Sequence, residues 1–282
     1  MPVKTDLAEA RQRAIETLLL WEGRASNSRL REFFTVHASQ AARDLAAYRD
    51  SAPHDVSFDV GSRAYVASEI LAPRLTKGKF GEYANLIGAP SYSAFNPGIP
   101  AAFERVCLED DLVKPSVFRP LHQAIAHGQG VTIAYASMSH PEPRKRTIYP
   151  HTLVYGGPRW HLRAWCTLRS AFLDFNLGRI SAAIRLPDRA PFGSQDDAGW
   201  TLEVKVRLVP HEALTASQQR LVRVEYTGGT SARVITRRAA LVPYLLQAYR
   251  AALDAKEQRP PEFLLQVDEP ERLPPLARWT PG

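Results

Sequence analysis

The sequence predicts an α+β protein that is divided into several domains. Its 282 residues, 45% of them hydrophobic, are too many for one small domain and can fill two or three hydrophobic cores. Apolar residues recur at helical spacing near the N-terminus, at a period of two after Gly130, and in both patterns after Trp200. We therefore expect a helical N-terminal unit, a central β-rich unit and a C-terminal α+β unit.

Three short helices are predicted within the first fifty or so residues. In the first, Asp6 and Glu9 have the spacing of a capping box, and an apolar face runs to a stop at Gly23. The second is NSRLREFF, with Ser28 as its N-cap. The third is SQAARDLAAYRD, with Ser39 as its N-cap. Its inward face is Ala41, Leu45 and Tyr48, and its outward face is Gln40, Arg43, Asp44 and Ala47.

A β-hairpin follows these helices. In VSFDVGSRAYV, Val56, Phe58 and Val60 alternate up to a Gly61-Ser62 turn, and the chain returns through Ala64 to Val66. Three helices and a hairpin are the order of a winged helix-turn-helix, whose last helix enters the major groove of DNA while the hairpin touches the flanking backbone. We assign residues 1–70 to such a DNA-binding domain.

Polar side chains at the front of the third helix suit base recognition. Gln40 can pair with adenine and Arg43 with guanine, and nearby arginines can neutralise phosphates. The predicted DNA contacts are Arg24, Ser39, Gln40, Arg43, Arg49 and Arg63. A three-helix protein-interaction module with a solvated charged face would have the same periodicity, so the pattern alone leaves both interpretations open.

Residues 71–116 are predicted to be a linker with short helices, because Gly, Pro and Ser separate short apolar patches there. A helix resumes at SVFRPLHQAIAHGQG, with Val117, Leu121 and Ile125 on one face and Gly128 as its stop. Several short strands follow, with Gly and Pro turns, which predicts a small bent β-sheet or barrel over residues 117–192. In PRWHLRAW, Trp160, Leu162 and Ala164 should face the core, opposite His161, Arg163 and Trp165.

The positive charge is concentrated in this β-rich segment. Residues 119–191 contain ten Lys and Arg against three acidic residues, Glu142, Asp174 and Asp188, a balance of +7 that equals the net charge of the whole chain. Most of these cations therefore need solvent or an anionic ligand, and arginines beside aromatic rings suit phosphate binding and base stacking. The predicted pocket is formed by Tyr135, Ser137, Arg146, His151, His161, Arg163 and Arg179. A basic face that only keeps the protein soluble is the alternative.

The last segment, residues 193–282, is predicted to be α+β. TLEVKVRLVP, LVRVEYT and ARVITRR have strand-like alternation, and RAALVPYLLQAYRAALDA has a helical face with Leu241, Leu245 and Ala248. That helix and the strand edges could form a dimer interface, or the helix could pack on its own sheet.

No pattern for catalysis, a cofactor or a metal stands out. The chain has no GxGxxG, Walker A, GxSxG or HExxH sequence, and Cys107 and Cys166 lie far apart without partner ligands. The remaining enzyme hypothesis is a nucleotide-processing site with His161, Arg163 and Asp174 as base. Neither a secretion signal nor a membrane span is evident, so we expect a cytoplasmic protein without membrane contact.

Five spaced motifs resemble one family in the right order: LLLWEGR, DLAAYRD, SRAYVAS, IAYASMS and DFNLGRI. RTIYPHTLVYGGPRWHLRAW followed by DFNLGRI looks like a WYL domain, a small Sm-like β-barrel of bacterial transcription regulators. The motif itself is Trp160, His161 and Leu162, with His where the family has Tyr. The likeness extends over nearly the whole chain to the WYL regulators of phage-defence islands, the BrxR and CapW type.

This resemblance implies a homodimeric repressor that binds inverted-repeat double-stranded promoter DNA, such as that of a phage-defence operon. It also implies a C-terminal dimerisation domain and a WYL pocket that senses a nucleotide or nucleic-acid effector. A histidine near several arginines should be less readily protonated, so His161 could add pH sensitivity. A single-stranded RNA-binding protein that uses the Sm-like barrel is the competing hypothesis.

Overall fold

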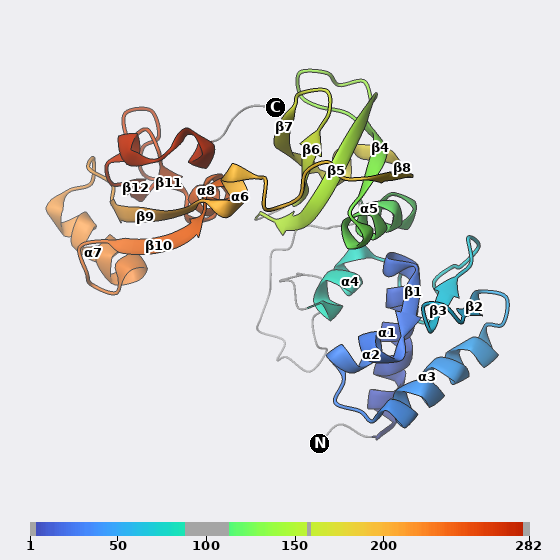
Figure 1. Cartoon of the computed structure of the whole chain (residues 1–282). Helices are drawn as coiled ribbons and strands as arrows, with labels where there is room; N and C mark the ends of the chain where they lie inside the picture. Colours follow the sequence, from blue (N-terminus) through green and yellow to red (C-terminus); the bar gives the residue numbers. More distant parts are fainter. Residues whose placement is uncertain (1–3, 88–112, 157–158, 279–282) are drawn as a thin grey trace.

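The computed structural model describes residues 4–87, 113–156 and 159–278. They form a winged-helix unit, a central β-sheet with helices beneath it, and a C-terminal α+β unit, arranged in that order along the chain (Figure 1). Cys107 and most of the predicted linker lie outside the described residues. Among the described helices, none has the length and apolar character to cross a membrane.

The N-terminal unit has the predicted order of helices followed by a hairpin. It contains α1 (Lys4–Glu22), β1 (Arg24–Ser26), α2 (Asn27–Phe33), α3 (Ala38–Ser51), β2 (Val56–Asp59) and β3 (Ala64–Ala67). The three strands form one antiparallel sheet in the order β1-β3-β2, so the wing hairpin β2-β3 is tied back to the chain that leaves α1. The short strand β1 was not predicted from the sequence.

The predicted N-caps of these helices are wrong. Helix α1 begins at Lys4, so Asp6 lies within it rather than before it. Ser26, not Ser28, caps α2, because its hydroxyl accepts a hydrogen bond from the backbone N–H of Arg29 at 3.2 Å. Helix α3 begins one residue before Ser39 and has no side-chain cap at His37. Since β1 ends at Ser26, the chain turns into α2 two residues earlier than the sequence pattern indicates.

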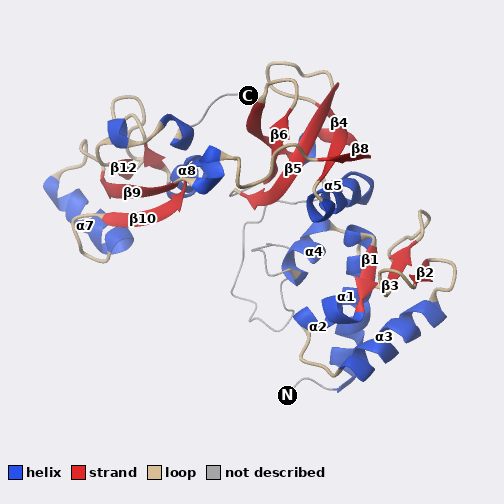
Figure 2. Ribbon diagram, in the orientation of Figure 1, coloured by secondary structure: helices blue, strands red, loops and turns tan. Residues whose placement is uncertain are grey.

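The central unit contains α4 (Phe80–Leu86), α5 (Pro115–His127) and five antiparallel strands. Gly128 ends α5 as predicted, in the left-handed conformation with φ of 60°. The strands are β4 (Gln129–Tyr135), β5 (Arg144–Tyr155), β6 (Trp160–Cys166), β7 (Ala171–Asn176) and β8 (Ile180–Arg189), with the 3-10 helix η1 (Leu177–Arg179) between the last two. Figure 2 shows the strands packed above α5.

The predicted Sm-like barrel is not confirmed. The sheet order is β7-β6-β5-β4-β8, and within the described residues no ladder joins the edge strands β7 and β8. Strand β5 is bulged between Pro150 and Thr152, and β4 shifts register twice against β8, so the sheet is irregular without closing.

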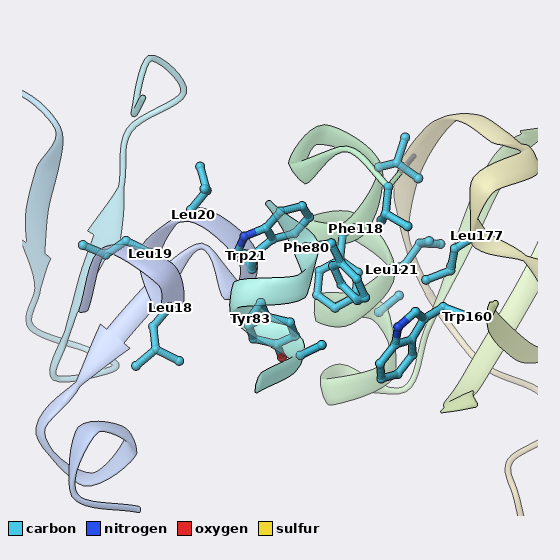
Figure 3. Packing of buried hydrophobic residues seen from close by; sticks show 14 of the residues in the cluster. Leu18, Leu19, Leu20, Trp21, Phe80, Tyr83, Phe118, Leu121, Trp160 and Leu177 are labelled. Carbon is cyan, nitrogen blue, oxygen red and sulfur yellow. The ribbon is translucent and has the colours of Figure 1, made fainter. Parts of the chain in front are cut away.

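One hydrophobic core extends from the winged helix into this sheet. Trp160, Leu162 and Ala164 face it, as their alternation predicted. Trp160 of β6 lies edge-on to Phe80 of α4, with ring centroids 5.2 Å apart. Phe80 in turn contacts Trp21 of α1 at 5.1 Å and Phe118 of α5 at 5.0 Å (Figure 3). Strand β6, which contains His161, is therefore connected by packing to the DNA-binding unit.

The C-terminal unit has a core of its own. It contains α6 (Ala198–Thr201), β9 (Glu203–Pro210), α7 (Ala216–Thr227), β10 (Arg233–Arg238), α8 (Val242–Tyr249), β11 (Ala251–Ala252) and β12 (Leu265–Val267), with a sheet order of β10-β9-β12-β11. The 3-10 helices are η2 (Ala239–Leu241), η3 (Pro270–Arg272) and η4 (Pro275–Ala277).

Two predictions for this unit are wrong. LVRVEYT is the end of helix α7, which begins with a capping box between Thr215 and Gln218, rather than a strand. Helix α8 is much shorter than predicted because Arg250 ends it in the left-handed conformation. Val242 and Leu246 are buried in the C-terminal core and Leu245 packs against it, so α8 packs within its own unit, which is one of the two arrangements that the sequence left open.

Candidate DNA-binding surface and ligand pocket

The front of α3 presents the predicted base-reading residues to solvent. Ala41, Leu45 and Tyr48 are buried against the other helices, as the helical spacing predicted. Ser39 and Arg43 are exposed and Gln40 is half-buried. Asp44 is only 7% exposed, so its predicted outward position is wrong. Arg11 of α1 explains this, because its Nε donates to Asp44 Oδ2 at 2.6 Å and pairs the buried charge.

The predicted phosphate-binding arginines lie on β1, at the turn of the wing and on α3 itself. Arg24 is exposed on β1, and Arg63 is exposed at the turn of the wing with φ of 50°. A non-glycine residue rarely adopts this left-handed conformation. Arg49 pairs with its neighbour Asp50 at 2.6 Å, both side chains being solvent-exposed. Arg49 is thus a less available cation than Arg24 or Arg63.

A pocket of about 440 Å³ lies where the central sheet meets the C-terminal unit. It contains six of the seven predicted pocket residues: Tyr135, Ser137, Arg146, His161, Arg163 and Arg179. The opposite wall comes from the C-terminal unit, including Pro243, Leu276 and Arg278. The sequence pattern did not indicate this wall, which the fold brings to the sheet from more than sixty residues downstream.

Arg163 is paired inside the protein and is not a free cation. Its Nε and Nη2 bind the two carboxylate oxygens of Asp197 at 2.7 and 3.0 Å, and its Nη1 lies 3.4 Å from Asp174. Asp197 is 1% exposed and caps α6 by accepting from the backbone N–H of Gly199. The expectation that most cations of the β-rich segment need solvent or an anionic ligand does not hold for Arg163, because Asp197 lies beyond residues 119–191 in the sequence.

His151 does not line the pocket. Its Nε2 lies 3.3 Å from Asp197 Oδ2, and its ring lies between those of Phe172 and Trp200, with centroids 5.7 and 5.4 Å away. Burial by itself would raise the pKa of Asp197, but hydrogen bonds from His151 and Arg163 hold that pKa well below its usual range. His151, Arg163 and Asp197 thus form a buried junction between the sheet and the C-terminal unit.

His161 lies at the wall shared by this pocket and a second one of about 720 Å³. Tyr244 of α8 packs on its ring at 5.0 Å and fills the space beside Gly156, where a Cβ would come within 2.2 Å of the Tyr244 ring. Burial, with a smaller contribution from the charges of Arg159 and Arg179, lowers the pKa of His161 to about 4. The predicted direction is confirmed, although burial rather than charge is its main cause.

The other two arginines of the predicted pocket, Arg146 and Arg179, have no acidic partner among the residues that the structure describes. The Arg146 guanidinium lies over the Tyr135 ring, 5.6 Å from its centroid, and its buried Nε has no hydrogen-bond partner. Arg179, in η1, lines the same pocket. Two guanidinium groups and an aromatic ring beside a neutral imidazole can bind an anion that carries a planar ring.

The fold and three domain matches define a class of protein, the winged-helix regulators that carry a WYL domain and a C-terminal dimerisation domain. The BrxR transcriptional regulator winged helix-turn-helix domain matches residues 8–89, the WYL domain matches residues 116–184, and the BrxR C-terminal dimerization domain matches residues 203–273.

Three relatives that match most of this chain share the name CapW. The DNA-binding transcriptional repressor CapW of Stenotrophomonas maltophilia is 32% identical over 217 residues, 75% of this chain and 73% of the relative. CapW of Escherichia coli is 29% identical over 280 residues, and CapW of Pseudomonas aeruginosa 28% over 282, each covering 96% of this chain and 92% of the relative. The chain belongs to the BrxR and CapW family of transcriptional regulators.

Proposed function

We propose that this protein is a transcriptional repressor that binds an inverted-repeat operator as a homodimer and leaves it when an anionic ligand, a nucleotide or nucleic-acid fragment, enters the pocket. The observation that supports this most strongly is the presence of two separate cationic surfaces in one chain. Arg24, Arg43 and Arg63 are exposed on the winged helix, and Arg146 and Arg179 line the pocket.

The winged helix would read DNA with α3 in the major groove and the wing on the flanking backbone. A two-fold dimer places two such helices on related half-sites, so the pair of short helices together recognises a long operator. The C-terminal unit would supply the dimer contact. Leu221 and Val224 of α7 are 63% and 70% exposed, and β10 is an edge strand with Val234 exposed.

Release requires that the ligand bind the DNA-free arrangement of the protein more tightly than the DNA-bound one. An anion beside Arg163 would compete with Asp174 and Asp197, and so loosen the junction that holds the C-terminal unit. The same ligand would touch His161, whose neighbour Trp160 packs on Phe80 in the shared core. Either change would alter the spacing of the two winged helices in the dimer.

Fluorescence anisotropy on duplexes from the upstream region of its own gene, and on an unrelated duplex, tests operator binding. The expected result is tight binding to one inverted repeat and much weaker, salt-sensitive binding to the unrelated duplex. Equally weak binding to all duplexes would contradict the repressor function. If single-stranded RNA bound more tightly than any duplex, the RNA-binding alternative would be favoured.

Release is tested by adding a thymidine mononucleotide or a short single-stranded oligothymidylate to the operator complex. Arg146→Ala and Arg179→Ala should bind operator normally and resist release. Arg185→Ala is the matched control, because Arg185 is an exposed arginine of β8 that does not line the pocket. Loss of operator binding in the pocket variants would instead place the pocket within the DNA interface. Unchanged release in both variants would remove these arginines from the ligand site.

A further inference from the structure

We infer that Arg43 reads the operator base while Gln40 and Asp44 are positioning residues that hold it, rather than Gln40 reading a base of its own. The inference rests on α3 entering the major groove as proposed above. It assigns unequal roles to two side chains that the sequence pattern treated as equivalent base readers.

The three side chains form a chain of contacts along α3 that starts in the interior. Asp44 is fixed through three hydrogen bonds, two to its carboxylate and one to its backbone carbonyl. Arg11 Nε donates to Oδ2 at 2.6 Å, Gln12 Nε2 donates to the carbonyl at 2.8 Å, and Gln40 Nε2 donates to Oδ1 at 3.0 Å. Gln40 Oε1 then accepts from Arg43 Nη2 at 2.7 Å.

The direction of the Gln40 amide is determined by chemistry. A carboxylate only accepts hydrogen bonds and a guanidinium only donates them. The amide nitrogen must therefore face Asp44 and the amide oxygen must face Arg43, because the flipped amide would oppose like groups on both sides.

The consequence for base recognition follows from the donor and acceptor inventory. Bidentate reading of adenine needs the amide oxygen and nitrogen of one glutamine together, and in Gln40 each of these atoms already has an intramolecular partner that fixes the orientation of the amide. Arg43 has five N–H donors and gives one to Gln40, so its remaining donors can still pair with guanine O6 and N7. Holding the long Arg43 side chain in place before binding also reduces the rotamer entropy that the complex must lose.

The experiment begins with a duplex that the wild-type chain selects from a randomised library, each base pair of which is then replaced in turn. Arg43→Ala should lower the ratio of affinities for the preferred G·C pair over the other base pairs at one position, by about 5- to 150-fold. Gln40→Met, which keeps the side-chain length and removes both hydrogen bonds, should relax the preference at the same base pair by a smaller factor. The double variant should match Arg43→Ala alone.

Arg11→Met provides the matched control. It removes the charge partner of Asp44 but leaves the contact between Asp44 and Gln40, so thermal stability should fall while the base preference stays. Asp44→Asn should weaken the preference at the Arg43 base pair, and its thermal unfolding shows whether the domain still folds.

The inference is overturned if Gln40→Met relaxes a different base pair from Arg43→Ala, or if the two effects add independently. It is also overturned if Arg43→Ala changes no base preference. A wild-type chain that selects no sequence at all would contradict the proposed repressor function instead, so the two failures are distinguishable.

Discussion

Arg163 is held by carboxylates from two parts of the chain, Asp174 on the neighbouring strand and Asp197 at the start of the C-terminal unit. Its side chain is 11% exposed and that of Asp197 is 2% exposed, so the pair is buried. Breaking a buried pair leaves an uncompensated charge, which is far more destabilising than losing a surface pair. At the scale of single residues, this arginine is a structural clamp next to the pocket.

Asp197→Asn tests the clamp. Asn is as good an N-cap as Asp, so the change removes the charge and keeps the cap of α6. We expect the free energy of unfolding to fall by about 3 kcal/mol, measured by urea denaturation. Asp268→Asn is the control, because the Arg207–Asp268 pair is 46% and 38% exposed and should contribute about 1 kcal/mol or less. Equal losses in the two variants would refute the clamp.

His161 makes stability depend on pH. Its pKa is about 4 in the folded protein and 6.5 in the unfolded chain, so the unfolded chain binds more protons between these values. Stability from this group is complete above pH 6.5 and is lost as the pH falls toward 4, by about 3 kcal/mol in all. His161→Gln should show a shallower fall in unfolding free energy over this window. Identical slopes in the variant and the wild type would contradict the assignment.

At the level of secondary-structure elements, a buried carboxylate joins α1, α3 and the segment that follows the wing. Glu16 of α1 has no exposed surface, and its Oε1 accepts from the backbone N–H groups of Arg74, Leu75 and Thr76. Its other oxygen accepts from the Tyr48 hydroxyl of α3 at 3.1 Å. A single carboxylate therefore fixes the recognition helix to the segment that leads from the wing to α4.

Arg63 tests whether the wing contacts DNA. Its left-handed backbone suits glycine, so Arg63→Gly should leave stability unchanged or raise it by up to about 1 kcal/mol. The same variant should weaken binding to all duplexes. The slope of log affinity against log salt concentration should fall by about 1, which corresponds to one phosphate contact. Thermal unfolding and anisotropy at several salt concentrations measure the two effects. Unchanged affinity at low salt would exclude Arg63 from the interface.

At the scale of the whole molecule, the winged helix and the central sheet share one core, whereas the C-terminal unit has its own. Phe80 is at the centre of the shared core, 1% exposed and in contact with Trp21, Phe118 and Trp160. A change in the pocket strand can therefore reach the DNA-binding unit through packed side chains.

Phe80→Ala should destabilise the winged helix and the central sheet together, by about 3 to 5 kcal/mol. Amide hydrogen exchange is the measurement, since protection in α3 and β6 should fall in parallel while protection in β9 stays. Loss of protection in only one of the first two would show that the units unfold separately and that Phe80 does not couple them.

The sequence pattern was sufficient to predict the helices and strands whose formation depends on residues close together in the chain. The spacing of Ala41, Leu45 and Tyr48 predicted α3, the alternation of Trp160, Leu162 and Ala164 predicted β6, and Gly128 predicted the end of α5. Alternation placed His161 and Arg163 opposite the core face of β6, and the motifs of the resembled family marked the other predicted pocket residues. The apolar residues of LVRVEYT fit both periods, and the segment is helical because the capping box at Thr215 starts α7 just before it.

By itself, the sequence determined the helical, β-rich and α+β units, the family and the two cationic surfaces, because periodicity, turn residues and spaced motifs are local properties. Tertiary structure alone decided which charges are free. Asp44 turns inward to Arg11, Arg163 meets Asp197, and Tyr244 closes on His161, each through partners distant in sequence. Whether a charge is available to a ligand depends on which groups folding brings within hydrogen-bond distance, and a count along the chain contains no such distances.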